Sequence, residues 1–114
     1  MLDARDVLDL QEAVDRVALD ESVLDYLLAI VSATRRSPLL ALGVSPRGSL
    51  ALLRAAQARA LVDGRGYVVP DDVKALAVPA LAHRVMVTGA SSTAAAADGE
   101  AVIRAIVQDV AVPR

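Results

Sequence analysis

Apolar residues recur every three or four positions along almost the whole chain, and this spacing most constrains what the chain can fold into. The pattern is typical of amphipathic helices, which bury one apolar stripe and expose the other faces. It therefore predicts an all-α fold, a small bundle of about five helices built as a single domain over residues 1–114. The first expected helix, over residues 3–17, shows the spacing through Val7, Leu10, Val14 and Val17.

Local signals mark where the next two helices begin and end. Asp20 is predicted to cap the start of a second helix that ends near Arg36. Ser45 is predicted to cap a third helix, with Pro46 at its first position, where the N–H that proline lacks would have no helical partner. Gly64 follows the last apolar position of that helix, which is where a left-handed residue commonly ends a helix.

The remaining segments are less regular. Pro70 is predicted to begin a fourth helix, and Pro79 inside it predicts a kink or a break. Residues 88–98 are small and low in complexity, so we expect a flexible loop there before the last helix, although the alanines in this stretch could extend that helix. Very short extended segments are expected near residues 17–19 and 67–69.

Composition leaves few catalytic chemistries open. The chain has no cysteine and a single histidine, His83, which excludes thiol nucleophiles, disulfides and His-rich metal sites. No phosphate-binding glycine motif is present, so the chain is not expected to be a self-sufficient enzyme. The adjacent acids Asp71 and Asp72 suit the first turn of a helix, so no metal site is expected there. It also lacks a secretory signal and an apolar run of the ~20 residues that a membrane span needs, which predicts a cytoplasmic protein without membrane contact.

Charge is unevenly distributed although the net charge is only −2. Residues 1–34 hold eight acidic residues and two arginines, whereas residues 35–65 hold six arginines and one aspartate. The near-neutral total argues against a nucleic-acid partner. A basic middle third suits an anionic ligand, although most of its arginines are expected to be solvated on helix faces.

Arg47 is the arginine with the most unusual position. Ser45 and Pro46 fix the start of the third helix, so Arg47 lies in its first turn, where the helix dipole favours an acidic residue. Backbone N–H groups and a guanidinium in the same region would bind a shared anion. A solvated arginine at a helix start is the alternative, and the residues alone leave both open.

Five short motifs occur in order along the chain. They are Gly43 with Ser45-Pro46-Arg47, Asp63-Gly64-Arg65, Tyr67-Val68, Pro70-Asp71-Asp72-Val73 and Leu81 with His83-Arg84. Together these motifs resemble the C-terminal lid subdomain of MoxR-family AAA+ ATPases, and the resemblance covers essentially the whole chain. Gly48 and Val69 depart from the family pattern, which usually has alanine and threonine there.

The resemblance implies a lid that closes over ATP bound, with Mg²⁺, by a preceding AAA+ core domain. Arg47 would be the sensor 2 residue that contacts the γ-phosphate, with Ser45 and Pro46 shaping its turn, and the lid alone would be inactive. The implied partners are that core domain and neighbouring subunits of a ring, a hexamer. A chaperone-like role towards proteins with metal-binding adhesion-type domains is also implied. A free-standing helical protein–protein interaction module is the alternative, and a helix-turn-helix DNA binder is a further one.

Overall fold

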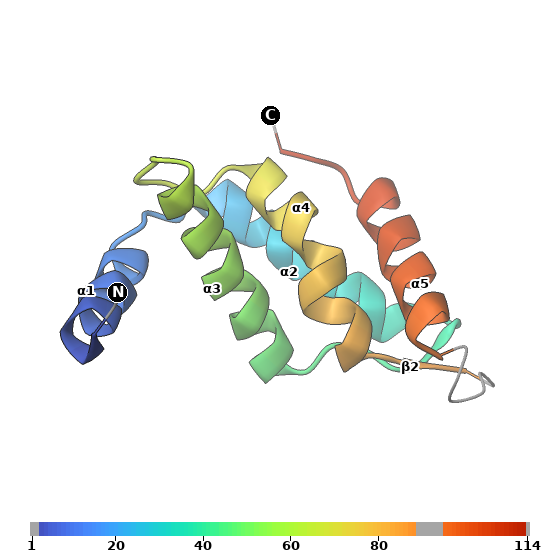
Figure 1. Cartoon of the computed structure of the whole chain (residues 1–114). Coiled ribbons are helices and arrows are strands. Elements are labelled where there is room, and N and C mark those ends of the chain that lie inside the picture. The colour runs from blue at the N-terminus through green and yellow to red at the C-terminus, as the bar shows by residue number, and fades with distance from the viewer. Residues whose placement is uncertain (1–2, 89–94, 114) are drawn as a thin grey trace.

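The computed structural model of the chain describes residues 3–88 and 95–113. Within these ranges the fold is a bundle of five α-helices, as the periodicity predicts (Figure 1). A short 3₁₀ helix, η1 (Ala82–Arg84), directly follows the fourth of them. The helices are α1 (Ala4–Asp15), α2 (Glu21–Arg36), α3 (Pro46–Val62), α4 (Pro70–Leu81) and α5 (Ala95–Asp109).

The bundle has two layers. Helices α3, α4 and α5 lie side by side in front, and α2 crosses behind them (Figure 1). Helix α4 packs against both of its neighbours in the front layer, while α2 contacts all three helices. Helix α1 lies apart at one end of the molecule, where it contacts α3 (Figure 1).

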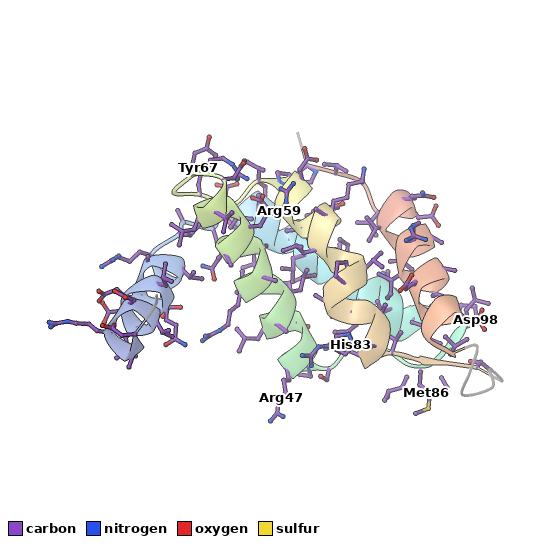
Figure 2. All side chains as sticks on the ribbon, in the orientation of Figure 1. Arg47, Arg59, Tyr67, His83, Met86 and Asp98 are labelled. Atoms are coloured by element: carbon purple, nitrogen blue, oxygen red, sulfur yellow. The ribbon has the colours of Figure 1, made fainter. Side chains whose placement is uncertain are left out.

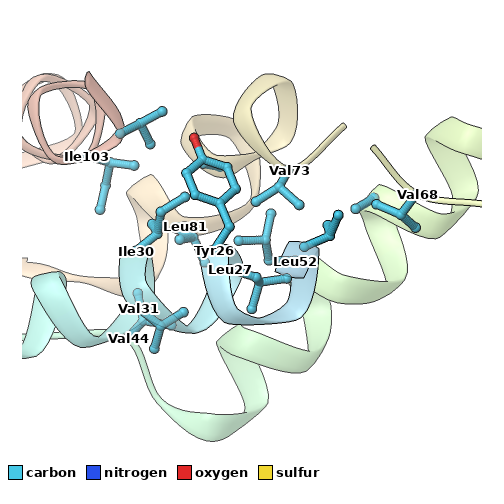
Figure 3. Close-up of a cluster of buried hydrophobic side chains, with 14 of the residues drawn as sticks. Tyr26, Leu27, Ile30, Val31, Val44, Leu52, Val68, Val73, Leu81 and Ile103 are labelled. Atoms are coloured by element: carbon cyan, nitrogen blue, oxygen red, sulfur yellow. The ribbon is translucent and has the colours of Figure 1, made fainter. Parts of the chain in front are cut away.

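The core between the layers is built from aliphatic side chains of α2 to α5 (Figure 3). Because the chain has no Phe or Trp, its largest fully buried side chains are leucines and isoleucines, with one buried tyrosine, Tyr26, beside them. Small residues on α3 and α4 let these two helices approach closely. The central buried residues are Leu27, Ile30, Leu52, Leu81 and Ile103.

The buried stripe of α3 differs from the one that its leucines predict. The sequence pattern selects Leu50, Leu53, Ala56 and Ala60, yet Leu50 is exposed and Leu53 is only half-buried. The stripe that faces the core consists of residues at strict four-residue spacing, and three of the four are glycine or alanine. They are Gly48, Leu52, Ala56 and Ala60.

The predicted helix boundaries are confirmed at three positions. The carboxylate of Asp20 accepts a hydrogen bond from the backbone N–H of Ser22 at 3.2 Å and so caps α2. Gly64, just after α3, has φ of +80°, a left-handed conformation that glycine adopts without steric cost. Helix α4 begins at Pro70 and is not broken at Pro79, since it continues to Leu81.

The prediction that α1 contributes an apolar face to the core is wrong. No residue of α1 is buried; Val7 and Leu10 are exposed and Val14 is half-buried. The helix also ends at Asp15, and Val17, which lies beyond it, is the first residue to join the core. Periodicity identifies the apolar face of a helix but not whether another element covers it.

Short extended segments complete the fold. Ala18 and Tyr67 form an isolated parallel bridge, which confirms the extended segments expected near 17–19 and 67–69. Strands β1 (Leu40–Leu42) and β2 (Met86–Val87) pair antiparallel, an element that the sequence did not predict.

The expected loop at 88–98 falls partly outside the described residues, at 89–94. Helix α5 begins at Ala95, so the last residues of that stretch are helical and not a loop. In the described part of the chain, no helix has the length and apolar character to cross a bilayer.

Candidate functional site

The candidate site is the first turn of α3. The Ser45 side chain accepts a hydrogen bond from the backbone N–H of Gly48 at 3.2 Å, and Pro46 is the first helical residue, as predicted. Arg47 is exposed, and its side chain extends from the end of α3 away from the bundle (Figure 2). The first turn contains no acidic residue, and Arg47 forms no salt bridge with any described residue.

The end of α2 holds this turn in place. Thr34, which is buried, donates its hydroxyl to the carbonyl of Val31 at 2.6 Å and accepts the backbone N–H of Val44 at 3.0 Å. Arg35 donates its Nε–H to the carbonyl of Val44 at 2.9 Å. Both polar groups of the Val44 backbone are therefore bound to α2, which fixes the direction in which α3 begins.

Gly43 permits this close approach. A Cβ atom at position 43 would lie 2.8 Å from the Cα and the backbone N of Arg35. Because those atoms belong to the helix backbone, they cannot move aside as a flexible side chain would. A larger residue at Gly43 would push the turn away from α2.

Gly48, the third residue of α3, has a similar role. A Cβ atom there would lie 2.7 Å from Cγ1 of Val44 and 3.2 Å from Cδ of Arg84. In the sequence, Gly48 is notable only as a departure from the family pattern. The structure shows in addition that Gly48 is buried and that the Arg84 side chain packs over it.

A second arginine cluster lies at the opposite end of α3. The carboxylate of Asp72, which is fully buried, accepts hydrogen bonds from Arg59 at 2.6 Å and from both terminal nitrogens of Arg65 at 2.7 Å. It also accepts the backbone N–H of Val69 at 2.8 Å, which is half of a capping box for α4. Arg59 and Arg65 therefore differ from the solvated arginines expected there.

These contacts shift the ionisation of both partners. Hydrogen bonds from Arg65 lower the pKa of the Asp72 carboxyl to about 2, against the effect of burial, and the Val69 N–H and Arg59 add to the lowering. The same pairing with Asp72 raises the pKa of Arg65. The aspartate is thus ionised at neutral pH and neutralises charge between α3 and α4.

The single histidine and the acidic residues are the other groups that could carry chemistry. His83 is exposed in η1. In residues 3–88 and 95–113, no three His, Asp or Glu side chains come together to hold a metal ion. Sequence reasoning missed the contributions of Thr34, Arg35 and Arg84. The available signal was a threonine on the apolar face of α2, since a buried hydroxyl needs a hydrogen-bond partner.

Comparison with known proteins gives consistent results. A family model described as the AAA lid domain matches residues 32–110. The uncharacterized protein YeaC of Bacillus subtilis is 44% identical over 108 residues, which cover 95% of this chain and 33% of YeaC. Chaperone MoxR1 of Mycobacterium tuberculosis is 36% identical over an alignment of 123 residues, which covers 100% of this chain and 32% of MoxR1. The chain spans about a third of the length of these curated relatives.

The fold is also shared with a solved structure. The crystal structure of a proposed ATPase from Cytophaga hutchinsonii matches 96% of this chain and 36% of that protein, with a TM-score of 0.83 and 28% sequence identity. The likeness therefore extends over nearly all of the helices described above.

Proposed function

Because the chain belongs to the AAA lid domain family, as the lid domain of a MoxR-family AAA+ ATPase, we propose that Arg47 senses the γ-phosphate of ATP. The nucleotide is bound by the AAA+ core domain of the same protein, and the lid closes over it. The groups that cradle the phosphates and hold Mg²⁺ belong to that core, so the lid alone does not hydrolyse ATP.

The observation that carries this proposal is the exposure of Arg47 in the first turn of α3 without an acidic partner among the described residues. An arginine at this end of a helix dipole is unfavourable for the helix itself. It becomes favourable when an anion is present, because the guanidinium and the dipole then attract the same charge. A buried, paired arginine here would have argued against sensing.

The rigid mounting of the turn supports a mechanical role. Thr34 and Arg35 tie the residue before Ser45 to α2, and α2 packs against α3, α4 and α5. A pull on Arg47 is therefore transmitted to the whole bundle. When the γ-phosphate leaves, this attraction is lost and the lid swings as a rigid body relative to the core.

The test is ATP turnover by the protein in which this lid is joined to its core domain. Arg47→Ala is expected to lower turnover by about 10²–10³-fold, the effect of losing one positioned charge in a transition state. Arg54→Ala is the matched control, because Arg54 is exposed on the same helix two turns later. Wild-type turnover in the Arg47 variant, with its circular dichroism unchanged, would contradict the sensing role.

The wider role proposed for the whole protein is chaperone-like action by a ring of six subunits. The name of the relative Chaperone MoxR1 supports the chaperone-like action. Proteins with metal-binding adhesion-type domains are the proposed clients. The mass of the core-containing protein in solution with ATP tests the ring, and a mass of one or two subunits at working concentration would contradict it.

A further inference from the structure

A cleft of about 780 Å³ opens beside the Ser45–Pro46 turn. The stretch 40–46, which includes β1 and the residues before α3, forms its apolar part. Two arginines line the rest, Arg35 from the end of α2 and Arg84 from η1. The cleft therefore combines two permanent positive charges from segments that are far apart in the sequence.

Arg84 has an unfilled hydrogen-bonding requirement. Its Nε atom is buried and has no hydrogen-bond partner among the described residues. Its aliphatic stem is held over Gly48, where a Cβ would come within 3.2 Å of Cδ. A buried donor without an acceptor is costly to keep, and native structures rarely retain one unless an ion, a water molecule or a ligand completes it.

Arg35 is also only partly used. Its Nε–H is donated to the carbonyl of Val44, and the described residues offer no acceptor to its terminal nitrogens. Neither Arg35 nor Arg84 forms a salt bridge with the carboxylates that the structure describes. A pair of guanidinium groups presents forked N–H donors, which match phosphate oxygens in geometry and charge.

We infer that Arg84 and Arg35 form a second anion position, which binds a phosphate group common to ADP and ATP. The inference rests on the proposed function, because the nucleotide whose γ-phosphate meets Arg47 brings its inner phosphates to the same end of α3. The stem of Arg84 packs against Gly48, the residue that follows Arg47 in the chain. The two positions therefore have different roles. The cleft binds a phosphate of both ADP and ATP, and Arg47 distinguishes ATP from ADP.

The first experiment uses the 114-residue chain and inorganic pyrophosphate, followed by ¹⁵N NMR. Pyrophosphate is expected to shift the backbone signals of residues 43–48, and Arg84→Gln to weaken this binding about tenfold, the loss of one charge-assisted contact. Glutamine keeps part of the stem over Gly48, and the spectrum itself reports whether the fold is intact. Arg104→Gln is the matched control, since Arg104 is an exposed arginine beside Lys74 in a separate groove on α4 and α5.

Equal weakening by Arg84→Gln and Arg104→Gln would overturn the inference, because binding would then follow net charge alone. No shift at residues 43–48 would overturn it as well. Retained affinity in Arg84→Gln would do the same, and Arg35→Gln provides a second variant of the same cleft.

The second experiment measures nucleotide affinity in the core-containing protein. Arg84→Gln is expected to weaken ADP and ATP about equally, by about tenfold, whereas Arg47→Gln weakens ATP alone. Unchanged affinities in the Arg84 variant would overturn the cleft proposal and leave the sensing proposal intact. Weaker binding of both nucleotides by the Arg84 variant, together with no effect of Arg47→Gln, would instead contradict the sensing role of Arg47 and support the phosphate position in the cleft.

Discussion

At the end of α3 that leads towards α4, Arg59 and Arg65 share the buried carboxylate of Asp72, whereas at its start Arg35, Arg47 and Arg84 form no salt bridge within the described residues. The same residue type therefore has different roles around the two ends of one helix. Paired arginines at the far end connect two helices and neutralise a buried charge. Unpaired arginines at the start leave positive charge for a group that the chain does not supply.

This difference shows that the two roles depend on whether an arginine is paired with a carboxylate, which the amino-acid composition does not reveal. Of these five arginines, all except Arg84 lie in the basic middle third, and the sequence alone does not separate them into two groups. Variants that remove charge at each end of α3 should therefore have opposite consequences. Stability should depend on the paired end, and anion binding on the unpaired end.

The largest effect on stability is expected from Asp72→Ala. Removing the carboxylate leaves Arg59 without a partner and Arg65 with only the exposed Asp63, and losing one member of a buried ionic group costs about 3 kcal/mol. Asp71→Ala is the control, since Asp71 is exposed in the same first turn of α4 and should cost less than about 1 kcal/mol. Urea unfolding of both variants measures the difference, and equal losses would contradict a special role for Asp72.

The same carboxylate predicts an acid-sensitive contribution to stability. Because folding lowers the pKa of Asp72 from 3.8 to about 2, its contribution is complete above pH 3.8 and is lost as the pH falls towards 2. The free energy of unfolding of the wild type should fall by about 2 kcal/mol more than that of Asp72→Asn over this range. Parallel pH profiles for the two proteins would show that Asp72 titrates normally.

At the start of α3, the Ser45 cap is expected to matter for stability, whereas the charge of Arg47 is not. Ser45→Ala removes the acceptor for the Gly48 N–H and should cost about 1 kcal/mol in urea unfolding. Ser45→Asn retains an N-capping side chain and should restore most of this loss. A cost that persists in the asparagine variant would point to some other role of the hydroxyl.

The smallest effect on stability is expected from Arg47→Gln. The side chain is exposed, has no carboxylate partner in the described part of the chain and opposes the helix dipole, so the change should stay within about 0.5 kcal/mol and be slightly stabilising. The midpoint of urea unfolding measures it. A loss comparable to that of Asp72→Ala would place Arg47 among the structural arginines.

Local features of this fold could be predicted from the sequence, because each depends on neighbouring residues. The cap at Asp20, the Ser45–Pro46 start of α3 and the left-handed Gly64 are of this kind. Arg47 also follows from them, since a fixed helix start fixes its place in the first turn.

Features that depend on distant residues could not be predicted. The pairing of Arg59 with Asp72 and the hold of Thr34 on Val44 each join segments that meet only in the folded chain. The pairing of β1 with β2 is of the same kind. Helix α1 shows the opposite error. Its apolar face can be identified in the sequence, but the sequence does not show that no other element buries this face.

The central claim is that Arg47 distinguishes ATP from ADP, and the ratio of their dissociation constants tests it most directly. In the core-containing protein, with a non-hydrolysable ATP analogue, Arg47→Gln should reduce the ratio of the Kd for ADP to the Kd for the ATP analogue by about tenfold. The Kd for ADP itself should change little. A ratio equal to that of the wild type would contradict the claim.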